Sequence, residues 1–298
     1  MMRALLAGFL LLLIGCAKRE YVVLYTSQDQ FYAEPILKEF TEKTGIEVRT
    51  VFDTESAKTA TLAHRLRAEK NNPQCDVFWS NEEMHTRLLA HDGVIAEADI
   101  NTAGYRTREI VVNTELVSTP PRSVLDLTNG TWKGRVALAY PLFGTTSSYF
   151  LALRQHWGEA TWRSWCEGLV RNGAKVVDGN SVVVRLVGAG ECAVGLTDSD
   201  DIHAGRRNSL PILPAPQVRE SFVIPNTISL VSGGERRALA QRLLDYLLHP
   251  DTLNKLVQLG ALQGINPESL EGNYLSVDWS KADLDAMNQE LKKIFLRS

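Results

Sequence analysis

The chain has 298 residues, of which 44% are hydrophobic and 22% charged, and its formal net charge is −3. This composition excludes an intrinsically disordered chain and is sufficient for a sizeable hydrophobic core. Its 32 basic and 35 acidic residues are too evenly balanced for nucleic-acid binding, so we expect no nucleic-acid partner. The sequence contains no motif for a catalytic zinc, a cradled nucleotide phosphate or a nucleophilic serine, so we expect a protein that is not an enzyme.

Residues 1–15 have the pattern of an export signal. Arg3 precedes an apolar run over residues 4–14, which is shorter than the roughly 20 residues of a membrane span. Leu13-Ile14-Gly15-Cys16 resembles the lipobox of bacterial lipoproteins, in which the signal is removed and the cysteine is lipid-modified. The resemblance implies a lipid anchor at Cys16 as the chain's contact with a membrane, and a location in the periplasm or at the cell surface. A plain secretory signal with a chance cysteine is the alternative.

The first part of the mature chain alternates between strand and helix patterns. Apolar residues recur with period two in the strands and with helical spacing between them. The predicted elements are a strand at 21–25, a helix from 31 that is closed by Gly45, a strand at 46–52, a helix at 59–70 and a strand at 76–79. This alternation favours parallel βαβ units, which collect ligands at the carboxyl ends of their strands.

A second unit of the same kind begins after Pro120-Pro121. Its predicted elements are strands at 135–139, 175–177 and 192–196, and helices at 144–156, 162–171 and 182–190. A Pro-rich stretch over 211–225 is followed by a strand at 228–231 and a helix at 235–248. The sequence therefore predicts an α/β protein with two units. Cys75, Cys166 and Cys192 allow one disulfide, and the sequence does not choose the pair.

A hydroxyl-rich turn opens the helix after the strand at 135–139. Thr145, Thr146 and Ser147 lie where free backbone N–H groups and the helix dipole favour an anion such as phosphate, carboxylate or carbonate. Asn180 and Ser181 form another turn at the start of a helix, pointing to the same rim. An ordinary helix cap with solvated hydroxyls is the alternative interpretation.

The turn after the strand at 192–196 is acidic. Asp198, Asp200 and Asp201 repel one another unless a metal ion, an amine or hydroxyl donors lie between them. We expect Asp200 or Asp201 to cap the following helix and another carboxylate to face the ligand. On this interpretation, changing Asp198 and Asp200 together to Asn abolishes solute binding and leaves the fold nearly as stable.

Further polar residues follow the strand at 76–79. Asn81 and Glu82 are a candidate polar pair for the pocket, and Trp79 is a candidate indole wall or, equally, a core residue. These residues and both turns above follow predicted strands, so we expect them at one cleft.

The segments together resemble the type II periplasmic solute-binding proteins of ABC importers, specifically the branch that binds ferric iron. The matching segments are Tyr25-Thr26-Ser27, Phe40-(x)4-Gly45-Ile46, Cys75–Trp79, Arg108–Thr114, Trp132–Val136, Gly190–Leu196 and Leu243–Pro250. They occur in the family's order over nearly the whole mature chain.

The resemblance implies two α/β lobes, each a mixed sheet flanked by helices, that close on a ligand in the cleft between them. It places 20–109 and 227–298 in lobe one and 112–222 in lobe two, with crossover strands near 110–113 and 223–226. In this arrangement Thr26 and Ser27 face the hydroxyl-rich turn across the cleft. It also implies a monomer that works with an ABC permease and its ATPase subunits.

The residues that bind iron in that branch are not retained. The family's histidine position is Asp29 here, its glutamate position is Asn81, and its tyrosine pair falls near Ser199-Asp200. If a metal binds, we expect Asp29, Asp198 and Asp200 to hold it, as part of the transported ligand and not as a cofactor.

Three functions remain open from the sequence. The resemblance implies a receptor for iron(III) with an accompanying anion. The residues favour a small anionic or zwitterionic solute such as a sugar phosphate or an aminophosphonate. A structural surface lipoprotein without a small ligand is the third, of a different class.

Overall fold

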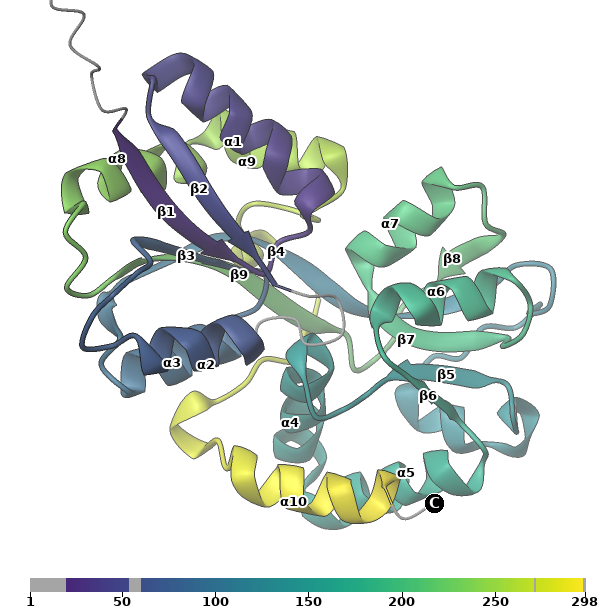
Figure 1. Ribbon diagram of the computed structural model, residues 1–298. Coiled ribbons are helices and arrows are strands. Elements are labelled where there is room, and N and C mark those ends of the chain that lie inside the picture. Colours follow the sequence, from purple (N-terminus) through teal and green to yellow (C-terminus); the bar gives the residue numbers. More distant parts are fainter. Residues whose placement is uncertain (1–19, 54–59, 271, 297–298) are drawn as a thin grey trace, which may run out of the picture.

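Two α/β lobes lie side by side in the computed structural model, which describes residues 20–53, 60–270 and 272–296 (Figure 1). The described chain therefore has the two-lobed α/β architecture that the sequence predicts. The expected signal at 1–15 and the lipidation site Cys16 lie outside the described residues.

Lobe one is built on the parallel strands β1 (Tyr21–Thr26), β2 (Glu47–Phe52) and β3 (Val77–Ser80), in the order β2-β1-β3. Side chains of a strand alternate between its faces. Val22 and Leu24 of β1 therefore pack on one side and Tyr25 on the other, in separate apolar cores. The helices of this lobe are α1 (Gln30–Thr44), α2 (Ala60–Ala68), α3 (Met84–His91), α8 (Arg237–Leu248) and α9 (Pro250–Leu259).

Lobe two contains the parallel strands β5 (Val136–Ala139), β6 (Lys175–Val177) and β7 (Val194–Asp198), with β8 (Ile212–Pro214) paired to β4 at its edge. Helices α4 (Gly144–Trp157) and α5 (Glu159–Arg171) cover one face (Figure 1). Helices α6 (Asn180–Gly188) and α7 (Ser199–Arg207) lie on the other side. Short 3-10 turns at Val124–Thr128 and Gly130–Trp132 precede β5.

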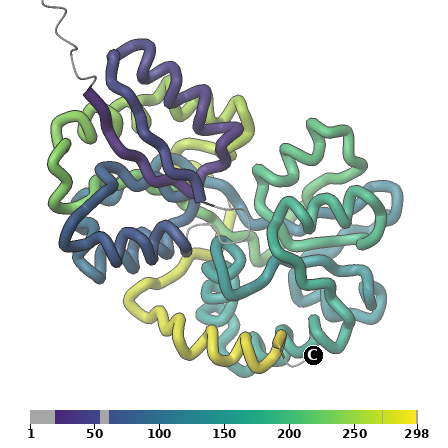
Figure 2. The backbone as a smooth tube through the Cα atoms, in the orientation of Figure 1, coloured from purple at the N-terminus to yellow at the C-terminus, as the bar shows by residue number. Residues whose placement is uncertain are grey.

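Two long antiparallel strands, β4 (Ile95–Asn113) and β9 (Phe222–Val231), connect the lobes (Figure 2). β4 pairs with β9 as far as Arg108 and with β7 from Arg108 to Val112. The outbound change of lobe thus lies nearer Arg108 than the expected 110–113, because Ile110 and Val112 already belong to the apolar core of lobe two. On the return, residues 223–226 come directly before Thr227, where β9 begins to pair with β3.

The C-terminal segment corrects the expected assignment of 227–298 to lobe one. After α9 the chain passes 3-10 turns at Pro267–Ser269 and Trp279–Lys281 and ends in α10 (Leu284–Phe295). Met287, Leu291 and Phe295 of α10 are buried in the core of lobe two, because their spacing of four residues gives the helix an apolar stripe that needs a partner. The chain therefore crosses between the lobes again after β9.

Cys75, Cys166 and Cys192 are buried free thiols in this structure, so none of the pairings left open by the sequence occurs in it. Across the described ranges, no helix has the length and apolar character needed to span a membrane.

Candidate functional site

A cavity of about 290 Å³ lies between the lobes. It is lined by Asn81 from lobe one, Arg106 from the crossing strand β4, and residues of lobe two that follow β5, β6 and β7. The lobe-two residues are Ala139, Tyr140, Phe143, Gly144, Thr145, Thr146, Asp178, Gly179, Asn180, Asp198 and Asp201. The lobe-two part of this lining lies at the carboxyl ends of parallel strands, where α/β sheets bind ligands.

The N-termini of α4, α6 and α7 converge on this cavity. Gly144, Asn180 and Asp198 line it, and each stands at or directly before the first residue of one of these helices. The first N–H groups of a helix have no partner within the helix and carry its positive dipole end. Gly144 has φ +55, and a Cβ at this position would meet nothing within 4 Å. The backbone is therefore bare at the start of α4, where an anion can approach the N–H groups.

Two arginines that the sequence analysis missed lie beneath the cavity. Arg106 and Arg108 are on β4 and are only 3% and 1% exposed. Arg106 Nη1 lies 2.7 Å from Asp200 Oδ2 and 3.4 Å from Asp198 Oδ2. Arg108 Nη1 lies 2.8 Å from Asp198 Oδ1. Their spacing of two places both guanidinium groups on one face of the strand, directly before the apolar Ile110 and Val112 of the same face, and this pattern is a signal for buried counter-ions.

Asp198 has its hydrogen-bonding capacity filled by the protein. Besides both arginines, it accepts hydrogen bonds from Thr145 Oγ1 at 2.7 Å and from Asn180 Nδ2 at 2.9 Å. Burial acts to raise the pKa of Asp198, but the charges of Arg108 and Arg106 and the hydrogen bonds from Arg108 and Thr145 outweigh it and lower this pKa. For Arg106, burial acts to lower the pKa, and the nearby Asp200 and Asp198 raise it. The network is therefore charged at neutral pH.

The acidic turn differs from the prediction in two respects. Asp198, and not Asp200 or Asp201, is the N-cap residue of α7, and the other two lie in its first turn. Asp198 lines the cavity, but it is 1% exposed and is paired with the protein's own guanidinium groups. The cation required between these carboxylates is supplied by β4, because this strand lies beside β7.

The hydroxyl-rich turn lies at the cavity as predicted, although the side chains of Thr145 and Thr146 form hydrogen bonds with the buried Asp198 and Arg108. Thr146 Oγ1 accepts a hydrogen bond from Arg108 Nη2 at 3.0 Å, and Thr145 donates to Asp198. Ser147 does not line this cavity, and its buried Oγ has no hydrogen-bond partner within the described structure. Ser181 is exposed and also lies outside the lining, whereas Asn180 is part of it.

Lobe one contributes less than predicted. Trp79 is 1% exposed and lies in the apolar core, so it is not a wall of the cleft; it sits on the central strand β3, which is buried on both faces. Thr26 is buried and donates to the Trp79 carbonyl oxygen at 2.9 Å. Ser27 Oγ bonds Asn81 at 3.1 Å and holds this residue at the cavity.

Two further lobe-one predictions concern Asp29 and Glu82. Asp29 is the N-cap residue of α1 and is not among the lining residues. Glu82 is 1% exposed and caps the start of α3 by accepting bonds from the backbone of Met84 and His85, so it does not complete the pocket.

Oxygen atoms of Asp198, Asp200 and Asp201 lie within 4.8 Å of one another. Within the described ranges this is the group of carboxylates that fits a metal ion, and it does not include Asp29.

The sequence matches a family model described as "Bacterial extracellular solute-binding protein" over residues 22–260. An Fe(3+)-binding periplasmic protein of Serratia marcescens is 27% identical in an alignment of 217 residues that covers 65% of this chain and 62% of that relative. The match thus spans less than two thirds of the Serratia protein. An uncharacterized protein of Haemophilus influenzae is 25% identical in an alignment of 273 residues that covers 82% of this chain and 78% of the relative.

Solved structures share the fold. Iron-bound HitA from Pseudomonas aeruginosa has a TM-score of 0.76 at 17% identity and covers 92% of this chain and 98% of its own. AfuA from Actinobacillus pleuropneumoniae with exogenous fructose-6-phosphate bound has a TM-score of 0.72 at 19% identity, covering 94% and 97%. The predicted two-lobed periplasmic-binding-protein fold is confirmed. Because the family model matches most of the chain, this protein belongs to the bacterial extracellular solute-binding proteins.

Proposed function

We propose that this protein is the extracytoplasmic substrate-binding lipoprotein of an ABC importer. It captures a small solute with an oxyanion group between its lobes and delivers the solute to the permease and its ATPase subunits. Membership of the solute-binding family supports this proposal, as do relatives named periplasmic binding proteins. The chain acts as a monomer in the periplasm or at the cell surface, held by a lipid on Cys16.

The observation that carries the proposal is the convergence of the N-termini of α4, α6 and α7 on an interlobe cavity of about 290 Å³. Each N-terminus contributes partial positive charge and free N–H donors. A volume of this size is near the lower end of small-molecule sites, so the solute is small. A structural lipoprotein has no need for such a cavity.

Two kinds of solute offer an oxyanion to these N–H groups. One is iron(III) with an accompanying anion, since the Serratia relative is named for ferric iron and HitA was solved with iron bound. The other is a phosphorylated organic solute, since AfuA was solved with fructose-6-phosphate.

A thermal-shift screen of the mature chain tests the proposal. Inorganic phosphate, fructose 6-phosphate, 2-aminoethylphosphonate and ferric citrate are each added to protein freed of bound solute, and the purified protein is analysed for metal. A ligand at 100 times its Kd adds about 2.7 kcal/mol to the free energy of unfolding, which raises the Tm measurably. We expect at least one oxyanion to raise the Tm. The absence of any shift contradicts the proposal and favours the structural lipoprotein.

The anchor is tested separately by Cys16→Ser in the full chain. We expect the unchanged protein to remain with membranes and to incorporate labelled palmitate, and the variant to incorporate none. Equal labelling of both proteins would rule out lipidation at Cys16.

A further inference from the structure

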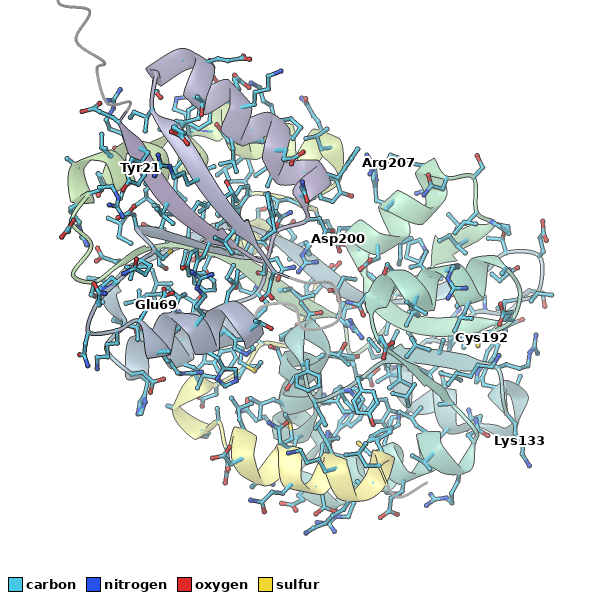
Figure 3. All side chains as sticks on the ribbon, in the orientation of Figure 1. Tyr21, Glu69, Lys133, Cys192, Asp200 and Arg207 are labelled. Carbon is cyan, nitrogen blue, oxygen red and sulfur yellow. The ribbon has the colours of Figure 1, made fainter. Side chains whose placement is uncertain are left out.

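A buried guanidinium group lies between the carboxylates of the cleft. Arg106 Nη1 is within 2.7 Å of Asp200 Oδ2 and 3.4 Å of Asp198 Oδ2, and Nη2 donates to the Asn81 carbonyl oxygen at 2.5 Å. Asn81 belongs to lobe one, and the two carboxylates belong to lobe two. Arg106 therefore lies at the centre of the site and contacts both lobes. Figure 3 shows Asp200 at the start of α7, where it faces lobe one.

This guanidinium occupies the position that a metal ion would need. Asp198 and Asp200 belong to the carboxylate group that fits a metal, and Arg106 Nη1 contacts both of them. Arg108 is also paired to Asp198, so two buried guanidinium groups lie against this group of carboxylates. A metal ion at this position would have to displace Arg106 and leave its charge buried without a partner, which is strongly unfavourable.

Arg106 also has a donor that no protein group uses. It is 3% exposed and lines the cavity, and its Nε–H has no hydrogen-bond partner among the described residues. A buried donor without a partner is unfavourable, and Arg106 lines the cavity, so a solute oxygen that reaches Nε–H on binding would satisfy this donor. The N-termini of α4, α6 and α7 line the same cavity and favour the same kind of group, an oxyanion.

The cavity wall carries an acidic group as well. Asp178 lines it and is not one of the carboxylates paired with Arg106 or Arg108. Carboxylates accept hydrogen bonds and attract cations, so this part of the wall suits hydroxyl or ammonium groups of the solute. A bare inorganic anion offers neither.

We infer that Arg106 is the resident cation of the cleft, and that the solute is a metal-free organic oxyanion that also carries hydroxyl or ammonium donors. This inference rests on the proposed function and narrows it to one class of substrate. Arg106 thereby acts as a specificity-determining residue, because it binds the oxyanion and occupies the position of a metal ion.

Titration calorimetry of the mature chain tests this inference with inorganic phosphate, fructose 6-phosphate and 2-aminoethylphosphonate. Each titration is run in EDTA and again with ferric nitrilotriacetate. We expect at least one organic probe to bind in EDTA with the same Kd as in iron, and at least about 10-fold more tightly than inorganic phosphate. Phosphate binding as tight as that of both organic probes would overturn the role given to Asp178.

Substitution of Arg106 tests its role. We expect Arg106→Gln to weaken the organic probe about 10- to 100-fold, since one charge-assisted hydrogen bond is lost. Because this variant leaves buried carboxylates without their cation, the double variant R106Q/D200N is measured beside it, and the Tm of each free protein is recorded. Arg237→Gln is the matched control, since Arg237 pairs with Asp99 in lobe one outside the cavity. Unchanged affinity in both folded Arg106 variants overturns the inference.

The comparison of titrations with and without ferric ion distinguishes a failure of this inference from a failure of the proposed function. Binding of an oxyanion that requires ferric ion would overturn the metal-free solute and leave the receptor function intact. Binding of none of the probes, with or without iron, would overturn both.

Discussion

Arg207 Nη2 donates a hydrogen bond of 3.1 Å to the phenolic oxygen of Tyr32, which joins α7 of lobe two to α1 of lobe one. Arg207 Nη1 also donates to the Leu259 carbonyl oxygen at 3.1 Å, and its guanidinium lies 5.2 Å from the centroid of the Phe31 ring. Burial and the nearby Asp200 raise the pKa of Tyr32 to about 12, so the phenol stays neutral at physiological pH. These contacts exist only while the lobes are together, and they therefore favour the closed cleft.

Arg207→Gln is expected to weaken solute binding by about 2- to 5-fold, mainly through faster dissociation, because contacts of an exposed arginine contribute only about 0–1 kcal/mol. Stopped-flow dissociation of the solute identified by the screen measures this effect. Arg206→Gln is the matched control, since Arg206 is a neighbouring exposed arginine on α7. A dissociation rate that rises equally in both variants would show that charge near the cleft, and not the contact with Tyr32, is responsible.

Gly260 provides a sharper test of lobe closure. It ends α9 with φ +82, and a Cβ there would lie 2.2 Å from His203 Cδ2 on α7 of the other lobe. Gly260→Ala should therefore lower the Tm through backbone strain of about 1–2 kcal/mol and also hold the lobes apart. We expect a larger radius of gyration in solution scattering with solute present, and a weaker affinity.

Two companion variants separate the strain from the clash. Gly45 ends α1 with φ +74 and has open space around its Cβ direction, so Gly45→Ala carries the strain without touching lobe two. Adding His203→Ala to Gly260→Ala should restore closure and affinity but leave the Tm low. If the double variant remains open, contact between α7 and α9 is not what limits closure.

The sequence predicts these strands well because the signals for them are local. The strand at 175–177 is β6 with the same bounds, and the strands at 21–25 and 135–139 agree with β1 and β5 within one residue. Alternating apolar residues determine which face of each strand is buried, and this pattern is readable without knowledge of the fold.

The site is less predictable because its charges are paired over long distances in the chain. Arg106 and Asp198 are 92 residues apart and meet only because β4 lies beside β7. The sequence alone does not show which cation pairs with the acidic turn, so the turn is expected to need a cation or donor from the ligand. The position of α10 is hidden in the same way, since an apolar stripe does not state which lobe it covers.

The packing of α10 in lobe two makes Leu291 a core residue of that lobe. Leu291 is fully buried, and Leu291→Ala should lower the free energy of unfolding by about 2–5 kcal/mol, as in other large-to-small core changes. Lys292→Ala, at an exposed neighbouring position, should change it by less than about 0.5 kcal/mol. Urea denaturation of both variants measures the difference. A loss below about 1 kcal/mol for Leu291→Ala would contradict the packing of α10 against lobe two.

Asp198 is expected to stabilise the fold, in contrast to the sequence-based expectation that changing Asp198 and Asp200 together to Asn leaves the fold nearly as stable. Asp198→Asn removes the negative charge shared by two buried arginines, and breaking such a pair lowers the free energy of unfolding by about 3–5 kcal/mol. Because the folded-state pKa of Asp198 lies below its ordinary value of 3.8, its contribution is present above about pH 4 and is lost as pH falls through the folded-state pKa.

Urea denaturation from pH 8 to pH 3 measures this contribution. The difference in unfolding free energy between the unchanged protein and Asp198→Asn should be constant above pH 5 and should shrink below pH 4. Asp201→Asn is measured beside it, because Asp201 is a second carboxylate in the first turn of the same helix. Equal stability of Asp198→Asn and the unchanged protein at pH 7 would show that the two arginines do not need this carboxylate. If the difference in unfolding free energy persists undiminished at pH 3, the stability lost in Asp198→Asn comes from lost hydrogen bonds and not from lost charge.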